Sequence, residues 1–135
     1  MEIKPTQPAG YTIKQITLLE SSFKRELEIP FEQSLSISND LNISSESAVD
    51  FEDNHFTVVT ELNLIGKQEQ TNFYVFKVRM SGTFERIGEP ELKEEVFKRL
   101  NAPAIIYPFI REHVYNLALK SGIGNVIIPP VNFKV

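Results

Sequence analysis

The chain has 135 residues, a net charge of −4 and an apolar fraction of 41%, which fit one globular domain over residues 1–135 and leave little room for a second core. The acidic balance argues against nucleic-acid binding through a broad basic surface, and the absence of cysteine excludes disulfides, thiolate metal sites and thiol catalysis. No apolar run is long enough to span a membrane and the first residues do not resemble a signal peptide, so we expect a cytoplasmic protein without membrane insertion.

The amino-terminal part predicts a loose arm, a strand and a connection. Residues 1–9 carry two prolines among polar residues and are expected to form the arm. Residues 11–23 are rich in β-branched and aromatic side chains, and their apolar positions change parity between Ile13 and Ile16, as at a β-bulge. The following segment, residues 24–31, contains a proline that would end any helix early, so we expect a crossing connection.

A serine-rich region follows, in which apolar residues recur with a period of two. This pattern predicts a short, half-exposed strand interrupted near Asn39 and Asp40, and a plain linker is the alternative. The apolar residues are Leu35, Ile37, Leu41 and Ile43. Residues 50–54 are mostly acidic and are expected to form a solvated turn rather than a cluster of working carboxylates.

Two further strands and a hairpin are predicted next. Residues 56–64 alternate most clearly between apolar and polar side chains, and residues 66–70 are short enough for a hairpin loop. The run 73–80 has one apolar face, formed by Tyr74, Phe76, Val78 and Met80, and a mixed face, formed by Phe73, Val75, Lys77 and Arg79.

The carboxy-terminal part predicts two helices. Residues 91–100 carry acids early and bases late, as the helix dipole favours, and residues 101–103 are expected to end this helix. A second helix, residues 103–121, has Pro103 or Pro108 in its first turn and Gly122 as its stop. Its expected buried face comprises Ile106, Phe109, Ile110, Val114 and Leu117. The predicted class is α+β: a four-stranded antiparallel sheet with helices packed on one face.

The sequence offers no catalytic apparatus. His55 and His113 belong to no ligand-spaced cluster, and there is no nucleophile elbow, phosphate loop or metal motif, so we expect neither an enzyme nor a bound metal or cofactor. A ligand-binding or enzymatic cavity between sheet and helices is an alternative that no motif supports. Arg111 and Glu112 interrupt the apolar helix and are interpreted as polar anchors across a subunit interface, with direct ligand contact as the alternative.

The supply of apolar side chains remains to be explained. Ten phenylalanines, four tyrosines and two helices with broad apolar faces suggest more apolar surface than one small domain can bury. The surplus could be buried by self-association, or it could bind extended apolar polypeptide.

Several segments together resemble one protein family. Tyr107-Pro108-Phe109-x-Arg111-Glu112, a later glycine and Pro130-Val131-Asn132-Phe133 resemble the carboxy-terminal half of the SecB family of molecular chaperones. Tyr11-x-Ile13-x-x-Ile16 with Ser22-Phe23 is similar to the family's first strand, and Ser81-Gly82-x-Phe84 to the end of its last. The resemblance covers residues 10–133.

The resemblance implies a homotetramer, a dimer of dimers with helices between two sheets, that holds unfolded or precursor polypeptides without ATP. It implies client binding by Ile29, Phe31, Leu35, Ile37, Leu41 and Ile43. It implies an oligomer interface containing Tyr74, Phe76, Val78, Met80, Phe109, Arg111 and Glu112.

Two departures from the family bear on protein export. Family members dock the translocase motor SecA through acids on the outer sheet face; Glu20 matches one such position and Val75 lies on the same face, but Lys24 and Lys77 stand where acids are expected. The sequence ends at Val135 without the family's final helix and acidic tail, so we expect holding of unfolded chains rather than delivery to SecA. A dedicated chaperone of one antitoxin, or a non-catalytic interaction module, is the alternative.

Overall fold

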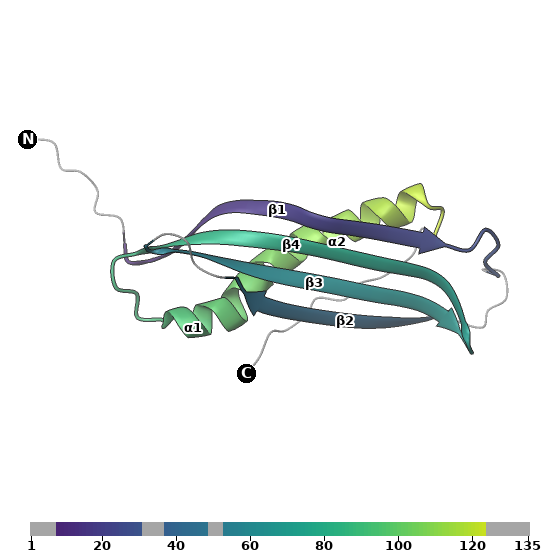
Figure 1. The fold of residues 1–135 in the computed structure, drawn as a ribbon, viewed down its shortest axis with the longest axis horizontal. Helices are drawn as coiled ribbons and strands as arrows, with labels where there is room; N and C mark the ends of the chain where they lie inside the picture. The colour runs from purple at the N-terminus through teal and green to yellow at the C-terminus, as the bar shows by residue number, and fades with distance from the viewer. Residues whose placement is uncertain (1–7, 31–36, 49–52, 124–135) are drawn as a thin grey trace, which may run out of the picture.

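The computed structural model describes residues 8–30, 37–48 and 53–123. Its strands are β1 (Gly10–Arg25), β2 (Ser38–Ser47), β3 (His55–Gln68) and β4 (Thr71–Ile87). They form one antiparallel sheet in the order β1-β4-β3-β2, as Figure 1 shows. The helical elements are α1 (Glu94–Val96), the π-helical turn η1 (Phe97–Asn101) and α2 (Ala102–Lys120).

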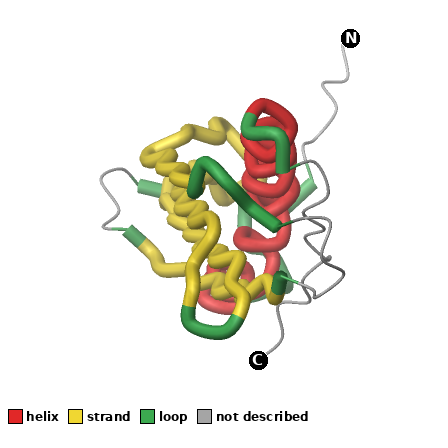
Figure 2. The backbone as a smooth tube through the Cα atoms, turned by 90° about the vertical axis from the view of Figure 1, so that its right-hand side faces the viewer, coloured by secondary structure: helices red, strands yellow, loops and turns green. Residues whose placement is uncertain are grey.

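Among the described residues, the helices cover one face of the sheet and no helix lies on the other face. Seen along the molecule, the strands form one layer and the helical elements a second layer beside it (Figure 2). This arrangement confirms the predicted α+β class. No helix among the described residues is both long enough and apolar enough to pass through a membrane.

The strands are longer than predicted, and one expected interruption is wrong. Asn39 and Asp40 pair with Gly66 and Ile65 in a continuous ladder, so neither a break nor a plain linker describes β2. A strand at the edge of a sheet tolerates these polar residues because one side of its backbone and much of its side-chain surface stay in water. The last strand runs to Ile87, beyond the predicted run 73–80 and beyond residues 81–84, which resemble the end of the family's last strand.

The predicted bulge in β1 is confirmed, between Ile13 and Gln15, and a second bulge lies between Leu18 and Glu20. Each bulge inserts one extra residue, so the first shifts the parity of the positions that face the helices and the second restores it. The consequence is that Ile13, Ile16 and Leu18 pair in turn with Phe84, Gly82 and Met80, all on the side that faces the helices.

The hairpin between β3 and β4 is tighter than the predicted loop 66–70. The ladder continues to the pair of Gln68 with Thr71, so only Glu69 and Gln70 form the turn. Glu69 has φ of 55°, which is the left-handed region that such tight turns require.

The predicted break between the two helices is wrong. The π-helical turn passes directly into α2, and the Ala102 N–H donates to the Phe97 carbonyl across this wider turn. Pro103 does not end the helix because it lies at the beginning of α2, where a missing N–H costs little. Pro108, the alternative first-turn residue, lies inside α2.

The core lies between α2 and the helix-facing side of the sheet. Its fully buried members on α2 recur every fourth residue, at Ile106, Ile110 and Val114. Phe109, predicted on the same buried face, is 45% exposed because it lies to the side of this stripe. The aromatic rings of Tyr11, Phe56, Phe84 and Phe97 pack together beneath η1.

Candidate functional site

A hollow of about 580 Å³ opens where the chain leaves β1. Its lining residues are Arg25, Leu27, Glu28, Ile29, Pro30 and Phe73. The Glu26 N–H donates to the Phe73 carbonyl at 2.8 Å, which extends the β1–β4 ladder by one bond before the chain turns away. Leu27 is 91% exposed, and Ile29 packs against the core while remaining partly open. The hollow therefore presents apolar side chains at the end of the sheet.

The edge strand β2, on the opposite side of the sheet, carries further partly open apolar side chains. Leu41 lies opposite Leu64, and Ile43 opposite Leu62, so both face the helices. Both side chains, like Ile37, are half-buried against the core. The structure thus places Ile29, Ile37, Leu41 and Ile43 on the rim of the core, and the predicted client-binding residues Phe31 and Leu35 lie outside the described residues.

The start of β2 and the hollow lie at the same end of the sheet. One row across the strands joins Arg25, Tyr74, Gly66 and Asn39. The Tyr74 hydroxyl donates to the Asn39 side-chain oxygen, which ties the edge strand to the sheet beside the hollow. Burial raises the pKa of Tyr74, and the bond to Asn39 partly offsets this rise.

The face of α2 that points away from the core is unexpectedly apolar. Its exposed large apolar residues are Ile105, Phe109, Tyr115 and Leu119. Glu112 is exposed on this helix and Arg111 is half-buried, with its guanidinium 6.0 Å from the centre of the Tyr107 ring. Burial raises the pKa of Tyr107, and the Arg111 charge partly offsets it.

A second exposed apolar strip runs along the edge strand β1. Ile13, Leu18 and Leu19 are 42%, 47% and 48% exposed. This exposed strip was not predicted, although the change of parity between Ile13 and Ile16 was a signal for it. The Ser21 hydroxyl lies 2.7 Å from His113 Nε2 and fastens the middle of the strand to α2.

The apolar face of β4 is buried within the single chain. Tyr74, Phe76, Val78 and Met80 have at most 7% of their surface exposed and belong to the core cluster with α2. Their predicted contribution to an oligomer interface stays a prediction.

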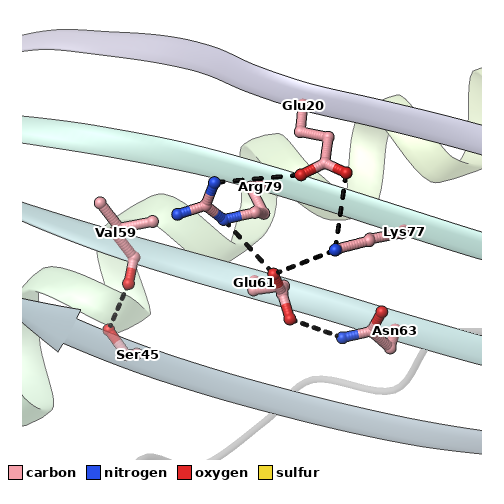
Figure 3. Close-up of polar contacts among 7 residues, drawn as sticks. All are labelled: Glu20, Ser45, Val59, Glu61, Asn63, Lys77 and Arg79. Carbon is pink, nitrogen blue, oxygen red and sulfur yellow. Dashed lines mark hydrogen bonds and ion pairs between the residues drawn. The ribbon is translucent and has the colours of Figure 1, made fainter.

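The outer face of the sheet carries a network of ion pairs, drawn in Figure 3. The Glu20 carboxylate lies 3.5 Å from Lys77 Nζ and 3.9 Å from Arg79 Nη1. The Glu61 carboxylate lies 3.3 Å from Arg79 Nε and 4.0 Å from Lys77 Nζ, and it accepts a bond from Asn63 at 2.8 Å. Two acids and two bases from β1, β3 and β4 therefore neutralise one another.

The predicted docking residues lie on this outer face. Glu20 is engaged by both bases of the network, whereas Val75 is 37% exposed and pairs with the exposed Lys24 across the sheet. A polar hollow of about 330 Å³ beside the network is lined partly by Ser44, Glu46 and Val59. This surface is hydrophilic and close to neutral.

Within residues 8–30, 37–48 and 53–123, no group of three or more histidine, aspartate or glutamate side chains is placed to hold a metal ion. Apart from the network around Glu20 and Glu61, the Glu85 carboxylate lies 2.8 Å from Lys14 Nζ and 3.6 Å from His55 Nε2. Its bond from Lys14 lowers the pKa of the Glu85 carboxyl. These are surface ion pairs.

Comparisons with known proteins agree with this geometry. The model of the SecB family, described as preprotein translocase subunit SecB, matches residues 12–135. The protein-export protein SecB of Saccharophagus degradans is 26% identical over 136 residues, which cover 93% of this chain and 76% of that protein. That of Halorhodospira halophila is 29% identical over 82 residues, which cover 61% of this chain and 47% of that protein. The second match spans about half the length of its relative.

A solved structure supplies the comparison of folds. A SecB-like chaperone from Mycobacterium tuberculosis, in complex with a ChAD peptide from the HigA1 antitoxin, matches 92% of this chain and 86% of its own, with a TM-score of 0.65 and 18% identity. At this identity the likeness shows that the sheet and its helix are arranged alike. Since the family match covers nearly the whole sequence and the fold agrees with it, the chain belongs to the SecB family.

Proposed function

We propose that this protein is a cytoplasmic, ATP-independent holdase that binds unfolded or precursor polypeptides. The observation that carries the proposal is the hollow at the end of β1, where Leu27 is 91% exposed above Ile29 and Phe73. An exposed leucine gains free energy by covering itself with apolar side chains of an extended polypeptide, by about 2 kcal/mol when fully buried. Several such contacts along the rim of the core hold an unfolded chain without covalent chemistry or nucleotide.

The experiment is suppression of aggregation of a reduced, unfolded client by stoichiometric protein. Leu27→Ser is the sharpest variant because the side chain packs on little of its own fold, so suppression should weaken while the thermal unfolding midpoint stays unchanged. Leu92→Ser is the matched control, since Leu92 is also exposed but lies outside the hollow. Equal suppression by the unaltered protein and Leu27→Ser would refute this assignment of the client surface.

A narrower role, protection of one antitoxin, is the second candidate. It is favoured by the likeness to the SecB-like chaperone that is bound to an antitoxin peptide. The same apolar rim would then take one sequence tightly instead of many weakly. A pull-down distinguishes the roles: one stoichiometric partner supports the dedicated chaperone, and a broad set of unfolded chains supports the general holdase.

We further propose a homotetramer. β1 is an edge strand with the exposed apolar residues Ile13, Leu18 and Leu19, and α2 exposes Phe109 and Leu119 on its outward side. An open edge with apolar side chains is a ready surface for a second copy of the chain, and closed symmetry would bury both surfaces in a dimer of dimers.

Docking to SecA through Glu20 and Val75 is the weakest of these proposals. The Glu20 carboxylate already forms ion pairs with Lys77 and Arg79, and Lys24 adds a positive charge opposite Val75. A partner surface built to meet acids would be repelled by Lys24. We therefore expect Lys24→Glu to bind SecA more tightly than the unaltered protein in a titration at low salt, and an unchanged affinity would argue against this docking face.

A further inference from the structure

Arg25, the last residue of β1, has an unusual set of partners. Its half-buried guanidinium donates to three backbone carbonyls and to no carboxylate in the described chain: Nε to Glu26 at 2.8 Å, Nη2 to Leu27 at 3.0 Å and Nη1 to Ser121. Two acceptors lie in the connection that follows β1. The third lies 96 positions away in the sequence.

The distant acceptor, the Ser121 carbonyl, lies at the C-terminal end of α2. Ser121 is the C-cap residue of that helix, and its N–H donates to the Leu117 carbonyl. Carbonyl groups at the C-terminal end of a helix have no partner within the helix and carry the negative end of its dipole, so they favour a guanidinium. In Figure 1 the end of β1 lies beside the end of α2, where this bond joins them.

The connection needs such a support because it leaves the sheet. After the Glu26 N–H bond to Phe73, Arg25 donates to the carbonyls of both Glu26 and Leu27. Glu26 and Leu27 begin the segment that leaves the sheet. In this segment the Leu27 side chain is exposed, and Ile29 lines the hollow. Arg25 lines the same hollow, so its alkyl stem forms a wall and its head fixes the backbone.

We propose that Arg25 is a positioning residue, which ties residues 26–30 to the C-terminal end of α2 and thereby keeps the hollow formed for an apolar side chain of a bound polypeptide. This inference rests on the proposed holdase function and adds to it the residue that sets the shape of the site. A preformed hollow binds more tightly because the backbone is ordered before the ligand arrives. The planar fork of arginine is required, since a lysine ammonium cannot reach carbonyls on both elements with the same geometry.

The test uses the full-length protein and a fluorescent synthetic peptide whose leucine-phenylalanine-leucine centre is flanked by serine and glycine. Arg25→Gln and Arg25→Lys should each raise the dissociation constant about tenfold, which corresponds to the ordering of one or two residues. Lys24→Gln is the matched control because it removes the neighbouring cation, whose side chain points to the other face of the sheet. It should leave the dissociation constant unchanged.

Amide hydrogen exchange separates positioning from a general loss of stability. In Arg25→Lys the Glu26 amide, which bonds to the Phe73 carbonyl, should exchange faster, while the amides of β3 keep their protection. Faster exchange throughout β3, or unchanged exchange and affinity in both Arg25 variants, would overturn the inference. If the unaltered protein does not bind the peptide, the holdase function is refuted, and exchange of the Glu26 amide still decides whether Arg25 holds the connection.

Discussion

The ring of Tyr74 lies directly over the backbone of Gly66 on the neighbouring strand. A Cβ atom added to Gly66 would lie 2.1 Å from the Tyr74 ring carbon Cζ, far inside van der Waals contact. The two residues are paired in register, and the Tyr74 hydroxyl reaches past the glycine to Asn39 on β2. Gly66 is therefore required as a site of close approach rather than as a turn residue, and the ring couples three strands.

We expect Gly66→Ala to be strongly destabilising because the ring must move and give up its bond to the edge strand. The expected loss in free energy of unfolding is about 2–4 kcal/mol, the range for overpacking combined with a lost buried hydrogen bond. Urea unfolding measures it. Gly10→Ala is the control, since a Cβ atom at Gly10 meets nothing within 4 Å. A Gly66→Ala variant as stable as Gly10→Ala would contradict the ring placement.

The features that were predicted correctly from the sequence are those that depend on local periodicity. A period of two in residues 56–64 and 73–80 reports which side of a strand is buried, and the structure buries Phe56, Phe76 and Val78 accordingly. The hairpin-length and crossing connections between the strands then predicted the antiparallel sheet, and the helices that follow the strands predicted its cover. The bulge in β1 was predictable for the same reason, because a slip in parity is itself a local signal.

The predictions that failed concern features that are set by contacts between residues far apart in the sequence. Nothing local distinguishes Phe109 from Ile110, and only the docking of α2 on the sheet decides which one is buried. Pro103 suggested a helix break, but its place beside a π-helical turn makes it a helix start. The Arg25 bond to Ser121 and the Glu61 network join residues that sequence spacing does not bring together.

The exposed apolar strips predict how the oligomer can be dissociated. Phe109→Asp should reduce the assembly size, because it places a charge on a surface that the proposed tetramer buries. The subunit should stay folded, since Phe109 is 45% exposed in the single chain. Light scattering across a dilution series measures the mass. Leu27→Asp, a charge on an exposed leucine of the hollow, is the control and should keep the assembly intact; a Phe109→Asp protein of unchanged mass would exclude α2 from the interface.

Reversing the charge of Lys77 tests the outer-face network. Lys77→Glu brings a third carboxylate toward Glu20 and Glu61, so the pairs shown in Figure 3 become repulsive. The side chains are 27–40% exposed, so the expected loss is about 1 kcal/mol or less and should shrink in high salt. Urea unfolding at low and high salt measures it against Lys24→Glu on the same face. A loss that salt does not reduce would mean that Lys77 stabilises by packing instead.

The ion pair of Lys14 with Glu85 makes a prediction about pH. The hydrogen bond from Lys14 is the main cause that lowers the pKa of the Glu85 carboxyl below its ordinary value of 4.5, and His55 contributes a smaller attraction. A carboxyl whose pKa is lower in the folded state stabilises the fold above its unfolded pKa. This contribution is lost as the pH falls through the folded pKa.

Lys14→Gln should therefore raise the pKa of Glu85 toward its ordinary value, because the amide keeps a donor but removes the charge that favours the carboxylate. Side-chain carboxyl chemical shifts followed by NMR through the acidic range measure the change directly. Lys67→Gln is a suitable control, since Lys67 Nζ lies 2.6 Å from the Asp40 carboxylate, elsewhere on the sheet. Its removal should leave the Glu85 titration where it is, and a Glu85 pKa that responds equally to both changes would show that the effect comes from net charge rather than from the Lys14 contact.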